Sequence, residues 1–272
     1  MKLRWLTSLI LANAVFTAPV NASATDTSGV DRSALRDVLQ TTGITTQIQL
    51  LEELVIQSAG TNANRCGATP PLSTIPSFST ESIVFDTLNG FQQTDDLDVS
   101  SLLKWFKSPL ADKIHKAEQT SINYEQFLDS VPAIKQNEHR FQTIKNIINN
   151  TKTIEFIVTV GTEIEYAGLL HSGCIAKAEI ISPGNKNPER LLANVTRSDK
   201  ALTAGLISND ITLELAYLLR NLTDEELKSY EEFTASKNSQ RFYNTLIKSV
   251  EKSFGLASDR IDLQESYSAV DF

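Results

Sequence analysis

The stretch TDEELKSYEEFTASKNSQRFYNTLIKSVEKSF, residues 223–254, decides the fold. Thr223 and Glu226 have the spacing of a capping box, in which each side chain accepts a hydrogen bond from the other residue's backbone amide. A helix is therefore predicted to begin there, and apolar residues then recur every three or four positions, as one buried helical face requires. Ser236 lies in a run of small and polar residues and can cap a second helix. The stretch predicts two helices with a break near Ser236.

An upstream stretch, DDLDVSSLLKWFKSPLADKIHKAE at residues 95–118, repeats this pattern. When Trp105 is aligned with Phe233, Ser108 falls on the serine of the later break and the apolar positions coincide. Pro109 follows at once, and proline is favoured at the first position of a helix, where its nitrogen has no hydrogen bond to lose. Two helices are therefore predicted again, with Trp105 as a core anchor.

The helices before these two stretches also recur in one order, a short helix followed by a long one. The expected long helices cover residues 44–59 in the first half and 152–170 in the second. Residues 153–160 are rich in β-branched side chains and are compatible with a buried strand as well, but helical spacing continues beyond them. We predict an all-α fold with two tandem helical repeats packed as a pseudo-twofold bundle.

The sequence divides into five segments on this reading. Gly255 is predicted to close the last helix, because glycine is common just after a helix end. The segments are a signal peptide (1–24), helical repeat 1 (25–120), a linker (121–138), helical repeat 2 (139–254) and a C-terminal tail (255–272).

The first 24 residues have the pattern of a cleaved export signal. Lys2 and Arg4 precede a short apolar run, which ends in the small residues Ala22, Ser23 and Ala24. The apolar run is too short for a membrane anchor. The pattern predicts a periplasmic or secreted protein, cleaved near Ala24.

The charge of the chain disfavours two classes of partner. Its formal net charge is −8, and loss of the signal would remove two further positive charges. An acidic protein approaches nucleic acid or an acidic membrane against its own field. No later segment is long and apolar enough to span a membrane. We predict no nucleic-acid partner and no transmembrane segment.

The chain has two cysteines, Cys66 and Cys174, which fall at equivalent places in the two repeats. An even pair in an exported protein usually forms a disulfide. Equivalent residues meet only near a twofold axis, so a Cys66–Cys174 bridge would join the two repeats at their interface. The alternative is two buried free thiols.

The sequence contains no complete catalytic or metal-binding motif. His171 and Cys174 could both bind a metal, but no second ligand pair follows, and a disulfide would remove the thiolate. His115 and His139 lie among charged residues and are predicted to be solvated at the surface. Motifs of a nucleophile elbow, a phosphate loop or a zinc protease are absent from the sequence. We predict no catalytic residue, metal or cofactor.

Acidic residues, an aliphatic residue, an aromatic pair, Ser-Pro and Lys follow one another in the last two helices of the first repeat. The residues are Asp95, Asp96, Val99, Trp105, Phe106, Ser108, Pro109 and Lys113. This pattern, partly repeated around Ser236, resembles the DUF2059-like helical domains of unknown function from the Gram-negative envelope. The resemblance implies a secreted or periplasmic helical protein and no catalytic residue.

Three classes of function remain compatible with the sequence. The first, and the one favoured, is a non-catalytic envelope protein that binds another protein or acts as a scaffold. The second is a carrier that holds an apolar ligand or lipid between its helices, which a large apolar cavity between the repeats would support. The third is a hydrolytic enzyme, which is least favoured because no nucleophile and base can be paired.

Overall fold

A computed structural model describes residues 31–67, 78–92, 94, 96–172 and 200–268 of the chain. Within these ranges the regular structure is entirely helical, so the predicted all-α fold is confirmed. Residues 153–160, which were also compatible with a strand, form the start of a helix. None of the described helices combines the length and the apolar composition needed to cross a membrane.

The first half of the chain and the connection after it form six described helices. They are α2 (Arg32–Thr41), α3 (Ile44–Cys66), α4 (Thr80–Phe91), α5 (Val99–Phe106), α6 (Pro109–Glu118) and α7 (Tyr124–Gln136). The predicted linker is thus largely helical.

The second half continues with five helices and a short 3-10 turn in its described part. They are α8 (Glu138–Asn150), α9 (Thr153–His171), α12 (Lys200–Leu218), the turn η2 (Leu219–Asn221), α13 (Asp224–Ala235) and α14 (Lys237–Ser268). Helix α14 passes through Gly255, so the predicted helix end at that glycine is wrong. Phe254 and Ala257 on either side are buried, and this packing outweighs the cost of about 1 kcal/mol for a glycine inside a helix.

The predicted caps and breaks are present. Thr223 Oγ1 accepts a hydrogen bond from the amide of Glu226 at 3.2 Å, and the Glu226 carboxylate accepts one from the amide of Thr223 at 2.8 Å. Ser108 accepts from the amide of Ala111 at 3.2 Å, and Pro109 takes the first position of α6. Each pair of helices therefore separates at its serine, which turns the chain and directs α6 toward the second half.

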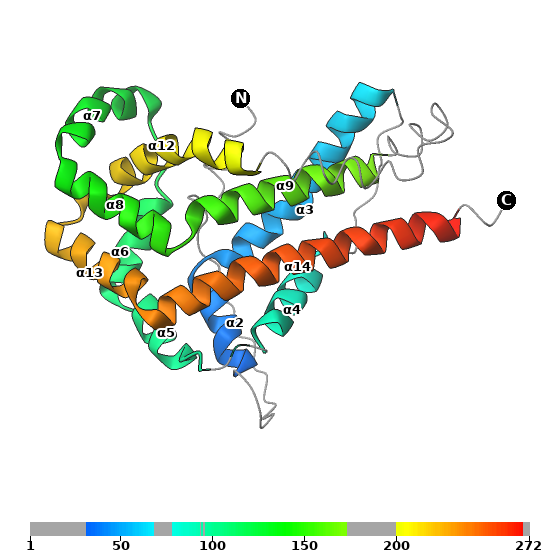
Figure 1. Ribbon diagram of the computed structural model, residues 1–272, viewed down its shortest axis with the longest axis horizontal. Coiled ribbons are helices and arrows are strands. Elements are labelled where there is room, and N and C mark those ends of the chain that lie inside the picture. The colour runs from blue at the N-terminus through cyan, green and yellow to red at the C-terminus, as the bar shows by residue number, and fades with distance from the viewer. Residues whose placement is uncertain (1–30, 68–77, 93, 95, 173–199, 269–272) are drawn as a thin grey trace.

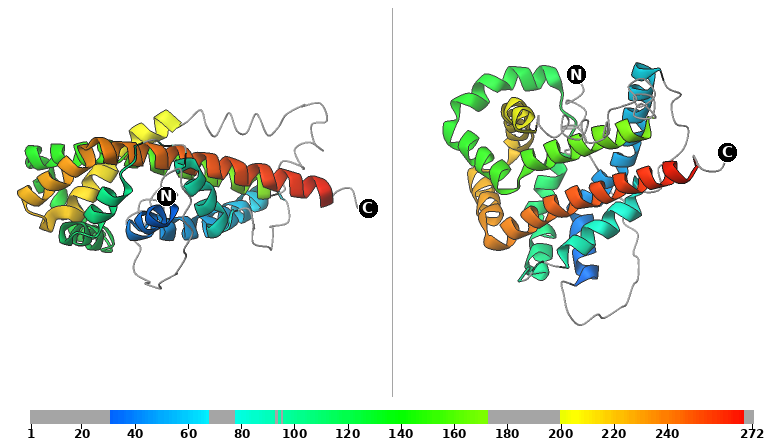
Figure 2. Two further views of the ribbon diagram at one scale, coloured as in Figure 1. Left: turned by 90° about the horizontal axis from the view of Figure 1, so that it is seen from below. Right: turned by 45° about the vertical axis from the view of Figure 1, so that its right-hand side comes forward.

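Corresponding helices form corresponding contacts in the two halves (Figures 1 and 2). Helix α2 packs on α5 as α8 packs on α13, and α3 packs on α4 as α9 packs on α12. The two long helices α3 and α9 lie against each other between the halves, and α14 runs along α4 and α9.

Several residues that the sequence alignment makes equivalent also meet in space. Trp105 stacks on Phe233 with ring centroids 4.2 Å apart. Lys113 pairs with Glu226 of the second half, while its counterpart Arg241 donates to the carbonyl of Asp96 in the first half at 2.7 Å. Reciprocal contacts are what packing about a common axis requires. The pseudo-twofold arrangement itself stays a prediction, which superposition of residues 31–118 on 139–246 would test.

The core is formed by two main clusters of buried side chains. One lies among α2, α3, α4, α9 and α14, with Phe78, Phe91, Phe242 and Phe254 at most 1% exposed. The other joins α6, α8, α9, α12 and α13, where isoleucines and leucines predominate. Both clusters contribute to the wall of the candidate site: Ile44 and Leu246 belong to the first, and Ile114, Ile147, Ile157, Ile211 and Leu215 belong to the second.

Candidate functional site

A cavity of about 690 Å³ lies between the two halves of the chain. This volume falls within the range of about 300 to 1,000 Å³ that small-molecule sites occupy. Helices α2, α3, α5 and α6 line it from the first half, and α8, α9, α12, α13 and α14 line it from the second. Most of the lining side chains are apolar, among them Ile44, Trp105, Phe106, Ile114, Ile147, Phe156, Ile157, Ile211, Leu215, Leu246 and Ile247.

Helix α6 supplies one continuous wall of the cavity. Ala111, Ile114, His115 and Glu118 recur at intervals of three or four positions, which places them on one face of the helix. All four line the cavity. Because Ser108 and Pro109 separate α6 from α5, this face is set by a break that the sequence encodes directly.

Glu118 gives this apolar cavity a titratable group. The Glu118 side chain is half-buried and lines the cavity, and burial raises the pKa of its carboxyl to about 7. Within the described part of the chain, the carboxyl has no hydrogen bond and no ion pair. A partly desolvated carboxyl without such partners favours its neutral form, because ionisation would place a charge in a poorly solvated site.

Two tyrosines from the second half lie within electrostatic range of Glu118. Burial and the charge of Glu118 raise the pKa of Tyr230 on α13 well above its ordinary value. The same two causes raise the pKa of Tyr243 on α14. Both tyrosines line the cavity. Both phenols therefore stay protonated near neutral pH and can donate hydrogen bonds into the cavity.

His115 also belongs to the cavity, so its prediction as a solvated surface residue is wrong. Its side chain is half-buried and hydrogen-bonded to the amide of Gln119. Desolvation lowers the pKa of His115, and the charge of Asp112 opposes this shift. Gly43, with a φ of 74°, lies close by, and a Cβ there would be 3.2 Å from His115 Cε1. The flanking lysines face outward, whereas the imidazole turns to the cavity wall.

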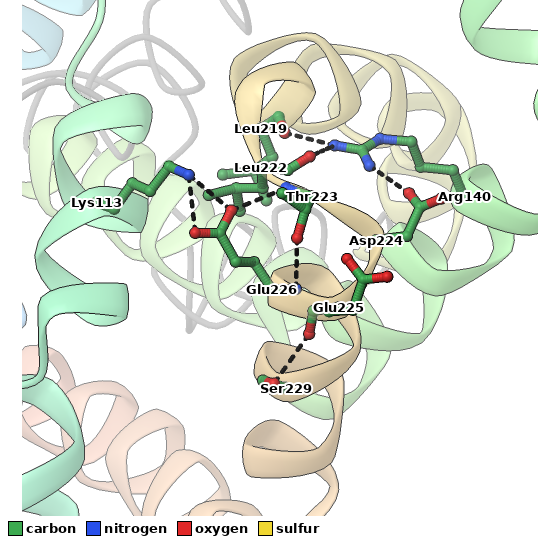
Figure 3. A network of polar contacts seen from close by, with 9 residues as sticks. All are labelled: Lys113, Arg140, Leu219, Leu222, Thr223, Asp224, Glu225, Glu226 and Ser229. Carbon is green, nitrogen blue, oxygen red and sulfur yellow. Dashed lines mark hydrogen bonds and ion pairs between the residues drawn. The ribbon is translucent and has the colours of Figure 1, made fainter.

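A network of charged residues fixes the beginning of α13 against α6 and α8 (Figure 3). Lys113 reaches the Glu226 carboxylate at 2.6 Å. Arg140 binds Asp224 at 2.7 Å and donates to the carbonyls of Leu219 and Leu222, each at 2.8 Å. These contacts hold the helix that carries Tyr230 against the helix that carries Glu118.

Four other polar residues, His139, Glu163, Glu165 and Asp98, are not among those that line the cavity, whereas Trp105 is. His139 is exposed, as predicted. Glu163 is buried and Glu165 exposed, so these two carboxylates diverge on α9. Asp98 caps α5 by accepting from the amide of Ser101 at 3.0 Å, a structural role. Trp105 packs on the core as predicted, but it is half-buried and borders the cavity.

The proposed disulfide and metal ligands fall partly beyond the described ranges. Cys66 ends α3, but Cys174 lies outside the described residues, so the Cys66–Cys174 bridge stays a prediction. Among the residues that the structure describes, no three His, Cys, Asp or Glu side chains are grouped as a metal ion would require.

No family model, curated protein or solved structure matches this chain. The resemblance to DUF2059-like domains therefore stays a prediction. The fold and the cavity define the class on their own: an all-α protein with a cavity of ligand size, whose described wall is mostly apolar and includes the carboxyls of Asp112 and Glu118.

Sequence reasoning missed Glu118 and the two tyrosines. The available signal was the helical spacing on α6, which puts Glu118 on the same face as Ala111 and Ile114, where an apolar residue is expected. Distant segments supply Tyr230 and Tyr243, and no local pattern relates them to Glu118.

Proposed function

We propose that the protein is a carrier or binding protein for a small, mostly apolar molecule held between its two halves. The observation that supports this is the cavity of about 690 Å³ with a largely apolar wall. Unfilled apolar space destabilises a folded protein, whereas a ligand that binds only the folded state stabilises it. This was the second of the three functions considered from sequence, and the cavity now favours it over the first.

Catalysis has weaker support than binding. His115 is the imidazole of the cavity, and its described hydrogen bond is to Gln119 instead of a serine or cysteine nucleophile. Ser108, which also lines the cavity, accepts from the amide of Ala111 and so serves as the N-cap of α6. The site offers a titratable carboxyl and apolar surface, which suit binding.

A protein-binding or scaffold role stays as a second proposal. Leu202 and Leu206 lie one turn apart near the start of α12, with 65% and 70% of their surface exposed. Exposed apolar side chains on one helical face can contact a protein partner. Alanine at both positions should then weaken capture of that partner while leaving binding in the cavity unchanged.

We also propose that the protein acts outside the cytoplasm, in the periplasm or beyond it. The support is the pattern of residues 1–24 and the pair of cysteines. Mass spectrometry of the mature protein should find Thr25 as its first residue and a linked Cys66–Cys174 peptide under non-reducing conditions. A retained Met1 or two free thiols would contradict this proposal.

Ligand binding can be tested by filling the cavity. Ala111 on α6 faces it, and Ala133 on α7 is exposed, so Ala111→Phe and Ala133→Phe form a matched pair. A neutral fluorescent probe, N-phenyl-1-naphthylamine, should bind the natural protein and Ala133→Phe equally. Ala111→Phe should bind it at least tenfold more weakly, with an unchanged circular dichroism spectrum. Equal binding by both variants would exclude the cavity as the site.

A further inference from the structure

The polar groups of the cavity narrow the class of ligand, an inference that rests on the proposed function. We propose that the cavity binds an organic cation with an apolar body, such as a hydrophobic amine or quaternary ammonium compound, with Glu118 as its counter-ion. The apolar body would lie against the aliphatic wall, and the positive head would lie beside the carboxyl of α6.

The first support is the charge balance around Glu118. The titratable groups that share its part of the cavity are Tyr230, Tyr243 and His115. The pKa shifts of all three favour their neutral forms near pH 7. Among the described residues, no cation offsets the charge that Glu118 carries once ionised. A bound cation would supply that charge, and a buried carboxylate is stabilised by a partner of opposite sign.

The second support is the aromatic part of the wall. Trp105, Phe106, Phe156, Tyr230 and Tyr243 all line the cavity. The faces of aromatic rings attract cations, and cages of several aromatic rings recognise quaternary ammonium groups. An anion gains nothing from these faces.

The charges at the edge of the cavity and the net charge of the protein are compatible with a positively charged ligand. Lys107 and Asp112 both line the cavity and are exposed, so their charges of opposite sign nearly cancel at its edge. The whole chain carries a formal net charge of −8, and its field draws cations toward the protein.

The cation's affinity should depend on pH in a definite direction. The Glu118 carboxyl titrates at about 7 in the protein without ligand, and a cation binds best beside the ionised form. Below that pH, the affinity should fall by up to tenfold per pH unit, with release of a proton on binding. Protonation of His115 would also weaken binding of the cation as pH falls. The variant His115→Gln removes this effect and leaves the contribution of Glu118.

Three probes with the same tail and different heads test the proposal: decyltrimethylammonium, decanol and decanoate, each below its micelle-forming concentration. Isothermal titration calorimetry of the whole protein at pH 6 and pH 8 gives their affinities. The cation should bind most tightly at pH 8, and its affinity should be about tenfold lower at pH 6. Binding should release a proton from the protein, which calorimetry in two buffers detects. The last measurement needs no variant.

Glu118→Gln keeps the size of the side chain and removes its charge. This variant should no longer bind the cation more tightly than the other two probes, and its affinity for the cation should no longer depend on pH. It should still bind decanol. Glu125→Gln on α7, where the side chain is exposed, is the matched control and should change neither.

Two results would overturn the proposal in distinguishable ways. If decanol or decanoate binds as tightly as the cation, or if Glu118→Gln binds the cation with unchanged affinity and pH dependence, the ligand is not a cation held by Glu118. The proposed apolar binding site would still be supported. Binding of none of the three probes would overturn the cationic ligand and the proposed function together.

Discussion

Two helix pairs that the sequence alignment makes equivalent, α4 with α14 and α12 with α6, pack very differently. Helix α4 lies along α14, where Gly90 is so close to Ser249 that a Cβ would overlap the serine side chain. Thr87 and Ser253 are hydrogen-bonded across the same seam at 3.2 Å. Helix α6 contacts α12 only briefly and leaves the cavity beside it. The small residues Gly90, Thr87 and Ser249 thus let α4 and the long helix α14 form a sealed seam, whereas the ten-residue α6 makes only a short contact with α12.

The same comparison can be made at a single position. In the alignment that pairs Trp105 with Phe233, Glu118 falls on Leu246, which is 4% exposed. Both residues line the cavity, so the apolar stripe continues on α14, whereas a carboxyl interrupts it on α6. An interruption that raises the cost of burial points to a role in binding more than to one in folding.

Truncation of an apolar side chain should be most damaging in the sealed region. Phe242 is fully buried among three aromatic neighbours, and its counterpart Ile114 borders the cavity. Phe242→Ala should reduce the free energy of unfolding by about 3 to 5 kcal/mol, and Ile114→Ala by about 2 kcal/mol. Urea denaturation measures both values, and an equal or larger loss for Ile114→Ala would contradict the contrast.

Glu118 should make the cavity side sensitive to pH. Its carboxyl titrates at about 7 in the folded protein and near 4.5 when unfolded, so only the folded state holds the proton between these values. The contribution of Glu118 to the free energy of unfolding is therefore largest below pH 4.5 and falls as pH rises to 7, by up to about 3 kcal/mol relative to Glu118→Gln. His115 has the opposite slope but is present in both proteins, so it cancels in the difference. A difference that does not vary with pH would contradict the assignment.

The close contact of α3 and α9 predicts opposite signs for two glycine substitutions. A Cβ at Gly168 would overlap the Ser58 side chain, whereas nothing lies within 4 Å of one at Gly60. Gly168→Ala should destabilise the protein by about 1 to 3 kcal/mol. Gly60→Ala should stabilise it by up to about 1 kcal/mol. Thermal unfolding checks both signs, and adding Ser58→Gly should recover part of the loss at Gly168.

The Lys113–Glu226 pair between α6 and α13 should contribute least. Both side chains are partly exposed, at 45% and 30%, and such pairs contribute about 0.2 to 1 kcal/mol. Lys113→Ala should lower stability by no more than that, and less at high salt. A larger, salt-independent loss would mean that the pair also shapes the cavity.

Most of the helical order could be predicted from the sequence because its signals are local. The capping box at Thr223, the break at Ser108 and Pro109, and the spacing of the apolar residues each depend on neighbours within a few positions. The end of α14 could not be predicted in this way, because buried neighbours override the glycine at Gly255. Tertiary packing decided that case.

The position of the cavity could not be predicted from the sequence, because it too depends on tertiary packing. Its described wall comes from nine helices, and space that no described side chain fills leaves no local pattern in the sequence. His115 is an example, because the charged residues around it in the sequence predicted a solvated side chain, whereas it lines the cavity. The identity of Glu118 on an apolar face was the one signal that could have marked the site.

Tryptophan fluorescence offers the most direct test of the central claim, that a ligand binds inside this cavity. The chain has two tryptophans, Trp5 within the predicted signal and Trp105 on the cavity wall, so Trp5→Phe leaves a single reporter. A decyltrimethylammonium derivative with bromine on its tail should quench Trp105 as it binds, and Ala111→Phe should abolish both binding and quenching. Saturable binding that leaves Trp105 fluorescence unchanged would place the ligand elsewhere and contradict the account.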